Sequence, residues 1–138
     1  MPILVHCHKG VGPAVIGTAL VAADNFSARY DLDRNRGIFT RPSHKLAGQS
    51  YVDRILVLDG AKGGVATAWM LHEMASRGVV PRALIFNRVN PFLAQGAAVG
   101  SVALVDRFEG DVTRLFRAGD TLRVDPAAGT VKILNRDA

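Results

Sequence analysis

The fold is decided by residues 54–87, "RILVLDGAKGGVATAWMLHEMASRGVVPRALIFN". The stretch begins with an apolar run at 55–58, which predicts a buried strand. Apolar side chains at near-helical spacing follow from Val65 to Met74, with Gly78 as the stop, and a second apolar run begins at Ala83. Parallel strands need a crossover connection, so we expect two parallel strands joined by a helix over 65–77.

The flanking segments extend this unit and add β structure at both ends of the chain. Residues 14–23, "AVIGTALVAA", predict an early strand, and a polar excursion over 24–50 holds one short strand around 38–39. Downstream, Pro91 opens a second helix over 91–99, and "SVALVD" predicts a third buried strand. The alternating segments 121–124 and 130–134 flank "DPAAG" and predict a hairpin. We expect an α/β fold with a mostly parallel central sheet.

Composition limits the class of protein. The chain has 138 residues, 49% of them hydrophobic and 21% charged, which is typical of one globular domain spanning 1–138. No apolar run approaches the roughly 20 residues of a membrane span, and the first residues lack the pattern of a secretory signal. We therefore expect a cytoplasmic protein without a membrane partner.

Charge admits an acidic partner or an anionic substrate. The formal net charge is +5 and the pI is near 10. The basic residues are spread singly, with the tightest group at Arg34, Arg36 and Arg41, and no aromatic residues interleave with them as a single-strand binding surface requires. The pattern favours a solvated basic face over a nucleic-acid site.

The cysteine content argues against a cofactor held by this chain. Cys7 is the single cysteine, so it cannot form an internal disulfide or hold an iron–sulfur centre alone. His6 and His8 flank it, but in a strand they face the side opposite Cys7, so at most two ligands converge. A terminal strand with polar side chains is the favoured interpretation, and no metal site is predicted.

The loop "DGAKGG", residues 59–64, joins a strand to a helix, an arrangement that points backbone N–H groups at an anion. It is not a nucleotide triphosphate loop, since Lys62 precedes the glycines rather than following them. Two interpretations remain open. The loop is an anion cradle to which Lys62 adds a charge, or it is a tight turn that needs Gly63 and Gly64 for positive φ.

The excursion offers a second set of polar groups. Its first residues combine hydrogen-bonding side chains with Phe26, a mixture that suits a small polar substrate, but Asp and Asn also form ordinary turns with their own backbone. His44, beside Lys45, is placed to meet an anion. Neither His44 nor His72 has a Ser or Cys at a spacing recognisable for nucleophilic catalysis.

Four segments in order resemble the small, swivelling subunit of aconitase X: "GTALVAADNFSARYD", "HKLAGQSYVDRILVLDGAKGG", "PRALIFNRVNPFLAQGAAVGSVALVDRF" and "AGDTLRVDPAAGTVKI". The similarity runs from Lys9 to Ile133. It implies a swivelling β/β/α domain like the mobile domain of aconitases. It also implies a larger partner subunit, which carries an iron–sulfur cluster or other metal site and much of the substrate pocket.

The resemblance implies a hydro-lyase that dehydrates a small anionic hydroxy acid, as family members do with cis-3-hydroxy-L-proline and phosphomevalonate. The family places a serine, thought to be the base, directly after the Lys/Arg-Gly pair. Here that position is Gly64, and the first hydroxyl after it is Thr67. The aromatic-Gly-Gly that the family has after the excursion's serine is replaced by Ala28-Arg29-Tyr30.

Three hypotheses follow. The enzyme takes its base from the partner or from Thr67, Ser27 or Tyr30; it catalyses a different reaction on a related acid; or the chain is a non-catalytic anion-binding or assembly module. A stand-alone binding module for an anionic metabolite is the rival from another class. The predicted catalytic residues are Thr67 and Ser27, and the predicted substrate-binding residues are Asn25, Phe26, Arg29, His44, Lys62, Gly63 and Gly64.

Overall fold

The computed structural model describes residues 3–26, 32–61, 65–89, 91–99 and 101–136. In these ranges the strands are β1 (Ile3–His6), β2 (Val15–Phe26), β3 (Leu32–Asp33), β4 (Ile38–Phe39), β5 (Ile55–Ala61), β6 (Ala83–Arg88), β7 (Ala103–Val105), β8 (Thr121–Asp125) and β9 (Thr130–Asn135). The helices are α1 (Val65–Ser76), α2 (Pro91–Val99) and α3 (Val112–Leu115).

Seven strands form one mixed sheet in the order β1-β9-β8-β2-β5-β6-β7. The pairs among β2, β5, β6 and β7 are parallel, whereas β1, β9, β8 and β2 pair antiparallel. The prediction of a mostly parallel sheet was therefore wrong. The physical reason is the length of β2, whose 12 residues pair with β8 over residues 15–18 and with β5 from residue 19 onward. One strand thus joins the hairpin at the end of the chain to the α/β middle.

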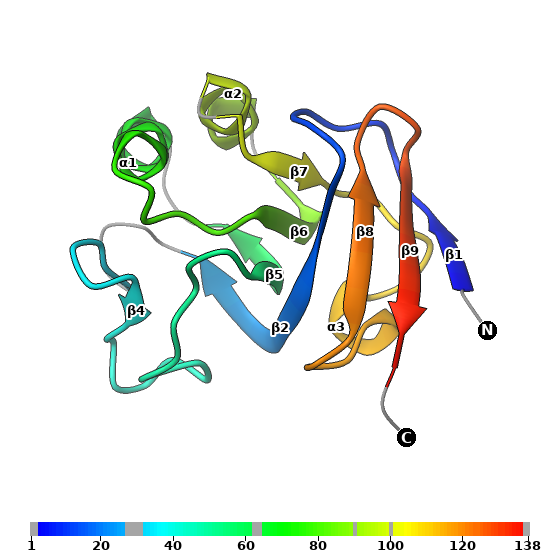
Figure 1. Cartoon of the computed structure of the whole chain (residues 1–138), viewed down its shortest axis with the longest axis horizontal. Coiled ribbons are helices and arrows are strands. Elements are labelled where there is room, and N and C mark those ends of the chain that lie inside the picture. Colours follow the sequence, from blue (N-terminus) through cyan, green and yellow to red (C-terminus); the bar gives the residue numbers. More distant parts are fainter. Residues whose placement is uncertain (1–2, 27–31, 62–64, 90, 100, 137–138) are drawn as a thin grey trace.

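The helices cover the parallel half of the sheet. α1 and α2 lie together on one face, and α3 lies on the other (Figure 1). Strand β5 is buried on both faces: Leu56 and Leu58 pack toward α1, while Ile55 and Val57 belong to the opposite core with α3 and the hairpin. A strand covered on both sides needs a continuous apolar run, which explains the composition of residues 55–58.

The predicted elements agree closely with those observed. The early strand continues beyond residue 23 to Phe26, the first helix ends at Ser76, and Gly78 follows it with φ of 71°. Such a left-handed glycine commonly ends a helix. Sequence analysis missed the single turn of α3, whose N-cap Asp111 accepts a hydrogen bond from the Thr113 N–H at 3.0 Å. A helix of four residues is too short to show a helical periodicity in the sequence.

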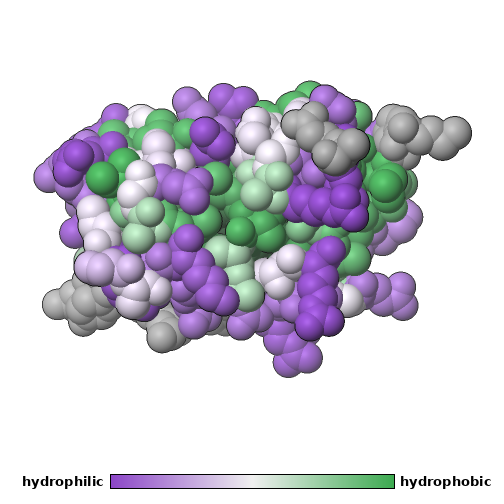
Figure 2. Space-filling model, turned by 90° about the horizontal axis from the view of Figure 1, so that it is seen from below, coloured by the Kyte–Doolittle hydropathy of each residue, from purple (hydrophilic) through white to green (hydrophobic). Residues whose placement is uncertain are grey.

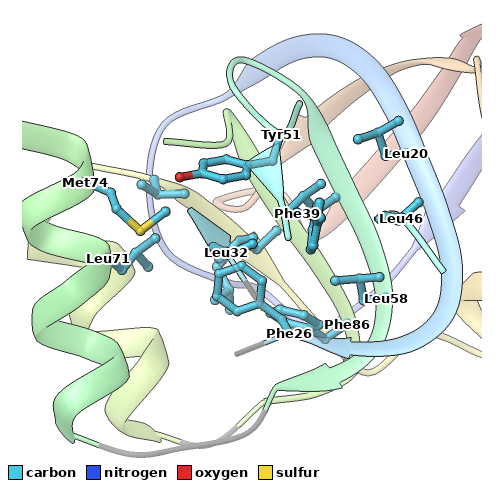
Figure 3. Packing of buried hydrophobic residues seen from close by; sticks show 14 of the residues in the cluster. Leu20, Phe26, Leu32, Phe39, Leu46, Tyr51, Leu58, Leu71, Met74 and Phe86 are labelled. Carbon is cyan, nitrogen blue, oxygen red and sulfur yellow. The ribbon is translucent and has the colours of Figure 1, made fainter. Parts of the chain in front are cut away.

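The excursion between β2 and β5 carries its own part of the core. Leu32, Phe39, Leu46 and Tyr51 are buried and pack with residues of the sheet and α1, including Phe26 (Figure 3). The prediction of one short strand is confirmed for β4, and the structure adds β3 as its antiparallel partner. The excursion is therefore anchored to the domain over much of its length.

The surface is mostly polar, with apolar side chains gathered near the middle of the face in Figure 2 and at its right end. The right end corresponds to the side of the molecule where β1 forms the edge of the sheet (Figure 1). Ile3 and Leu4 of β1 are about half exposed, at 49% and 52%. No helix in the described part of the chain is long and apolar enough to cross a membrane.

Candidate functional site

The carboxyl ends of three parallel strands meet at one edge of the sheet. Asn25 of β2 is the register partner of Gly60 in β5, and Gly60 is the partner of Arg88 in β6. In open α/β sheets ligands bind in the crevice at the carboxyl ends of the strands. This edge is therefore the candidate functional site.

A β-bulge shapes the end of β2. Ala22 is the partner of Leu58 and Asn25 is the partner of Gly60, so three steps along β2 match two along β5. The extra residue locally bends a strand, and such bulges are common next to active sites. Here the bulge lies between Ala22 and Asn25, in the stretch that holds Asp24.

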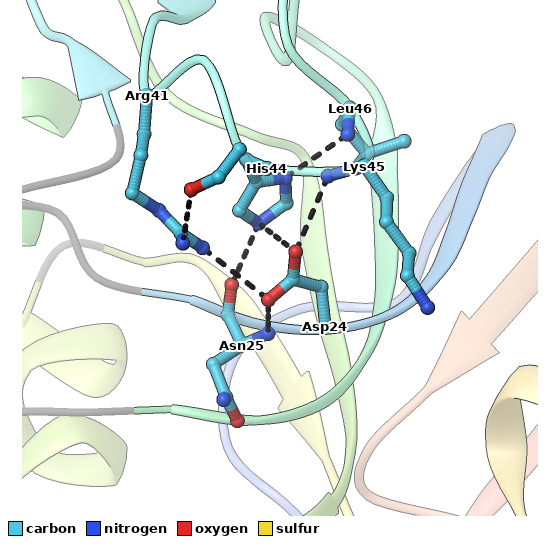
Figure 4. Close-up of polar contacts among 7 residues, drawn as sticks. Asp24, Asn25, Arg41, His44, Lys45 and Leu46 are labelled. Carbon is cyan, nitrogen blue, oxygen red and sulfur yellow. Dashed lines mark hydrogen bonds and ion pairs between the residues drawn. The ribbon is translucent and has the colours of Figure 1, made fainter.

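The Asp24 carboxylate ties this bulge to the excursion. It accepts hydrogen bonds from the backbone N–H of Asn25 at 2.8 Å and of Lys45 at 3.2 Å, and from the Arg41 guanidinium at 3.3 Å (Figure 4). Burial alone would raise the pKa of Asp24, but these donors and the charge of Arg41 hold it below its ordinary value. Asp24 is therefore ionised at neutral pH and acts as a clamp.

His44 forms the second tie between the excursion and β2. Its Nδ1 accepts a hydrogen bond from the Leu46 N–H at 3.0 Å, so Nε2 is the nitrogen that donates to the Asn25 carbonyl oxygen at 2.8 Å (Figure 4). The ring also stacks on Phe39, with 4.6 Å between centroids, and the residue is only 3% exposed. His44 positions the Asn25 backbone. Its predicted contact with a substrate anion stays a prediction.

The Asn25 side chain lies beside Gly60. A Cβ atom placed on Gly60 would lie 3.7 Å from Asn25 Oδ1 and 3.8 Å from the Arg88 carbonyl oxygen. The Asn25 amide forms no hydrogen bond with the described residues, although both its backbone N–H and its carbonyl do. The clamp thus holds the backbone of Asn25 and leaves its amide available to a ligand.

Comparison with known proteins decides the family. A family model described as the aconitase X swivel domain matches residues 4–133. The chain belongs to this family. The phosphomevalonate dehydratase small subunit of Methanocella arvoryzae is 29% identical over 126 residues, covering 91% of this chain and 96% of that protein. That of Methanopyrus kandleri is 32% identical over 114 residues, covering 83% and 84%.

Solved structures agree with the family assignment. The crystal structure of Thermococcus kodakaraensis aconitase X in its holo form matches with a TM-score of 0.88 and 26% identity, covering 96% of this chain and 99% of that chain. The sequence-based resemblance and the predicted swivelling α/β fold are thereby confirmed, with a mixed rather than a mostly parallel sheet.

Several residues that the aconitase X resemblance singles out lie outside the described residues. These are Ser27, Arg29, Lys62, Gly63 and Gly64. The described strands show where their segments start: Phe26 and Ala61 are register partners at the ends of β2 and β5. The described ends of the two strands therefore lie side by side, and the role of the residues that follow them stays a prediction.

The structure describes only the backbone of Thr67, and it shows the Phe26 side chain as buried. Thr67 lies in the first turn of α1, directly after the glycine-rich segment, but its side chain is outside the described atoms. Phe26 is fully buried, with its ring centroid 6.1 Å from that of Phe86, so its side chain belongs to the core. Their predicted roles stay predictions.

Sequence reasoning missed two features of this swivel domain. One is the Asp24 clamp, whose partners Arg41 and Lys45 lie 17 and 21 residues away. The other is Arg88, which reaches the site edge through its pairing with Gly60. The order of the parallel strands was a usable signal for Arg88, because equivalent ends of neighbouring parallel strands lie at the same edge.

Among the described residues no cluster of three His, Cys, Asp or Glu side chains could hold a metal ion. The strand β1 ends at His6, so Cys7 and His8 lie just beyond it. Burial, and then the charge of Asp106, raise the pKa of Cys7 to about 11.

We predict that Cys7 is a slow nucleophile. Only the thiolate reacts, and at pH 8 the raised pKa leaves about a hundredfold less of it than an unperturbed thiol has. Iodoacetamide should alkylate Cys7 about a hundredfold more slowly in the folded chain than in the same chain unfolded in urea, as measured by mass spectrometry. Equal rates would show that the thiol is not shielded.

Proposed function

We propose that this chain is the small subunit of an aconitase X-type hydro-lyase, and that it closes the active site of a large subunit over a small hydroxy acid. The observation that carries the proposal is the end-to-end match to chains of the same size: 96% of this chain aligns with 99% of the aconitase X chain. The relatives named phosphomevalonate dehydratase small subunit match over comparable lengths. They favour a phosphorylated hydroxy acid over cis-3-hydroxy-L-proline as the substrate.

The site edge supports binding of such an anion. The Asn25 amide and the backbone at the ends of β2 and β5 present hydrogen-bonding groups, and the chain carries a net charge of +5. With Cys7 as the only cysteine, an iron–sulfur cluster or other metal is assigned to the large subunit. Such a centre supplies Lewis-acid chemistry at the leaving hydroxyl. This chain contributes substrate positioning and closure.

An exposed aromatic side chain supports the proposal that this chain binds a large subunit. Trp69 of α1 is 68% exposed, and it follows Thr67 by two residues in the helix that starts at the site edge. Exposed tryptophans are enriched among the residues that dominate protein–protein binding. A subunit that covers the site would also reach this helix.

The first test concerns the base. Removal of a proton next to a carboxylate needs a positioned acceptor, which contributes about 10²–10⁴-fold in rate. We propose Thr67 or Ser27 for that role, because each hydroxyl is close in sequence to the paired ends Phe26 and Ala61. Thr67→Ala or Ser27→Ala, assayed in a complex with an aconitase X-type large subunit, should lower turnover by at least a hundredfold for the correct residue, with assembly intact.

The outcomes separate the hypotheses. If both alanine variants keep full turnover, the base belongs to Tyr30 or to the partner. Gly64→Ser restores the family's serine, so a gain of dehydratase activity where none existed would favour the alternative that the natural chain is a non-catalytic binding or assembly module. A chain that stays monomeric beside the large subunit and binds an acid alone would contradict the proposed subunit role.

A further inference from the structure

A pocket of about 530 Å³ lies beside the candidate site, at the same edge of the sheet. It is formed by the end of β1, the end of β6 and the loop between β7 and α3. Its described lining includes His6, His8, Arg88, Arg107, Glu109 and Gly110. None of them belongs to the Asp24 clamp. The volume is in the range of pockets that hold small metabolites.

Two arginines give the pocket its charge. The Arg88 side chain is exposed and forms no ion pair with the described residues. Arg107 lies 3.7 Å from the Asp106 carboxylate, but Asp106 is only 14% exposed and accepts a hydrogen bond from the Val89 N–H at 3.1 Å. Glu109 is the one carboxylate among the described lining residues, and Asp106 lies beside Arg107, so Arg88 is the lining guanidinium that has no ion pair with a described residue.

The backbone that carries these arginines is fixed. Arg107 has a left-handed φ of 60°, and its N–H donates to the Asn87 carbonyl oxygen at 3.0 Å. The Asn87 amide donates to Asp59 at 2.8 Å and Asp111 at 3.1 Å, and its oxygen accepts from the Val112 N–H at 2.9 Å. Asn87 is thereby fully occupied in joining the β6 end to the β7–α3 loop. Arg88 and Arg107 therefore project from two segments that these hydrogen bonds hold in a fixed relation.

We propose that this pocket binds the phosphate or carboxylate group of a small metabolite, with Arg88 and Arg107 as its charged ligands. Guanidinium groups bind planar or tetrahedral oxyanions with two parallel N–H donors each. His6 and His8, both exposed, add ring nitrogens that can form hydrogen bonds to the lining of the pocket. The anionic group belongs either to a separate metabolite or to the far end of the dehydratase substrate, and the latter source rests on the proposed function.

The first experiment uses the full chain alone. Inorganic phosphate is titrated into ¹⁵N-labelled protein, and saturable amide shifts are expected at His8, Arg107 and Gly110. Arg88→Gln and Arg107→Gln should each weaken binding at least tenfold. Arg123→Gln is the matched control, because Arg123 is an exposed arginine on β8 outside the pocket lining. Thermal unfolding checks that each variant is folded.

Amide shifts that fail to saturate would overturn the proposal, and so would an equal loss of phosphate affinity in Arg88→Gln, Arg107→Gln and Arg123→Gln. Either result would indicate that phosphate is attracted by the overall positive charge rather than bound in this pocket. The second experiment identifies the source in the complex with the large subunit. A raised KM with unchanged kcat in Arg107→Gln assigns the anionic group to the substrate, while unchanged kinetics with lost phosphate binding assigns it to a separate metabolite. Absence of dehydratase activity would contradict the proposed function and leave the first experiment standing.

Discussion

Replacing Arg136 with alanine should lower the free energy of unfolding by about 3 kcal/mol, the lower end of the range for breaking a buried ion pair. Arg136 donates to both carboxylate oxygens of Asp120, at 3.0 and 2.8 Å, and to the Leu115 carbonyl oxygen at 3.0 Å. Asp120 is only 1% exposed, so removal of Arg136 leaves a buried charge with one remaining donor, the Arg117 N–H. Urea unfolding at pH 7 measures the loss.

The loss of stability caused by Arg136→Ala should depend on pH. Burial would raise the pKa of Asp120, but the hydrogen bonds from Arg136 and Arg117 hold it below the ordinary value of 3.8 for an aspartate. A carboxyl with a depressed folded pKa contributes stability above its unfolded pKa and loses it as the pH falls through the folded pKa. The difference between the natural chain and Arg136→Ala should therefore be constant above about pH 5 and shrink below 3.8.

Two controls test the cause. Arg123→Ala removes an exposed arginine of β8 and should change stability by about 0.5 kcal/mol or less. In the Asp120→Asn background, Arg136→Ala should cost much less than in the natural chain, because no buried charge is then left unpaired. Equal losses in the two backgrounds would show that Arg136 acts through packing rather than through Asp120.

The α/β middle of the fold could be predicted because its signals are local. The run at residues 55–58 is apolar on both faces of β5, and Gly78 adopts the left-handed φ of 71° that a helix stop needs. The mixed sheet could not be predicted in the same way. Pairing of Val15 with Val124 joins residues more than a hundred positions apart, and nothing in either strand indicates which edge accepts the hairpin.

The sequence indicated which segments form the candidate site, but it did not indicate the contacts between their side chains. The ends of β2 and β5 were singled out from the sequence, and the pairing of Phe26 with Ala61 brings them together. The role of His44 was not accessible. It lies in a polar segment typical of a surface loop, yet Leu32, Phe39 and Leu46 of that segment are buried around it. Burial of the segment, rather than its composition, turns the imidazole toward Asn25.

In the proposed complex with a large subunit, replacing Asp24 with alanine should lower dehydratase turnover about a hundredfold, while the isolated chain stays folded. The carboxylate holds Asn25 against the 41–45 segment through three donors, and loss of that clamp frees the end of β2 to shift. A displacement of about 1 Å of a positioning group costs on the order of a hundredfold in rate. The effect is expected in kcat, measured by steady-state kinetics with saturating substrate.

Asp33 provides a matched control for this prediction. Its carboxylate also accepts two backbone hydrogen bonds in the excursion, from Asn35 at 3.0 Å and Arg36 at 3.2 Å, but it forms no contact with Asn25. Asp33→Ala should therefore reduce stability without reducing turnover. Hydrogen exchange gives a readout independent of activity: the Asn25 and Lys45 amides should exchange faster in Asp24→Ala and unchanged in Asp33→Ala, since only Asp24 accepts their hydrogen bonds. If both variants lose activity equally, the excursion acts as a whole and Asp24 has no special part in positioning Asn25.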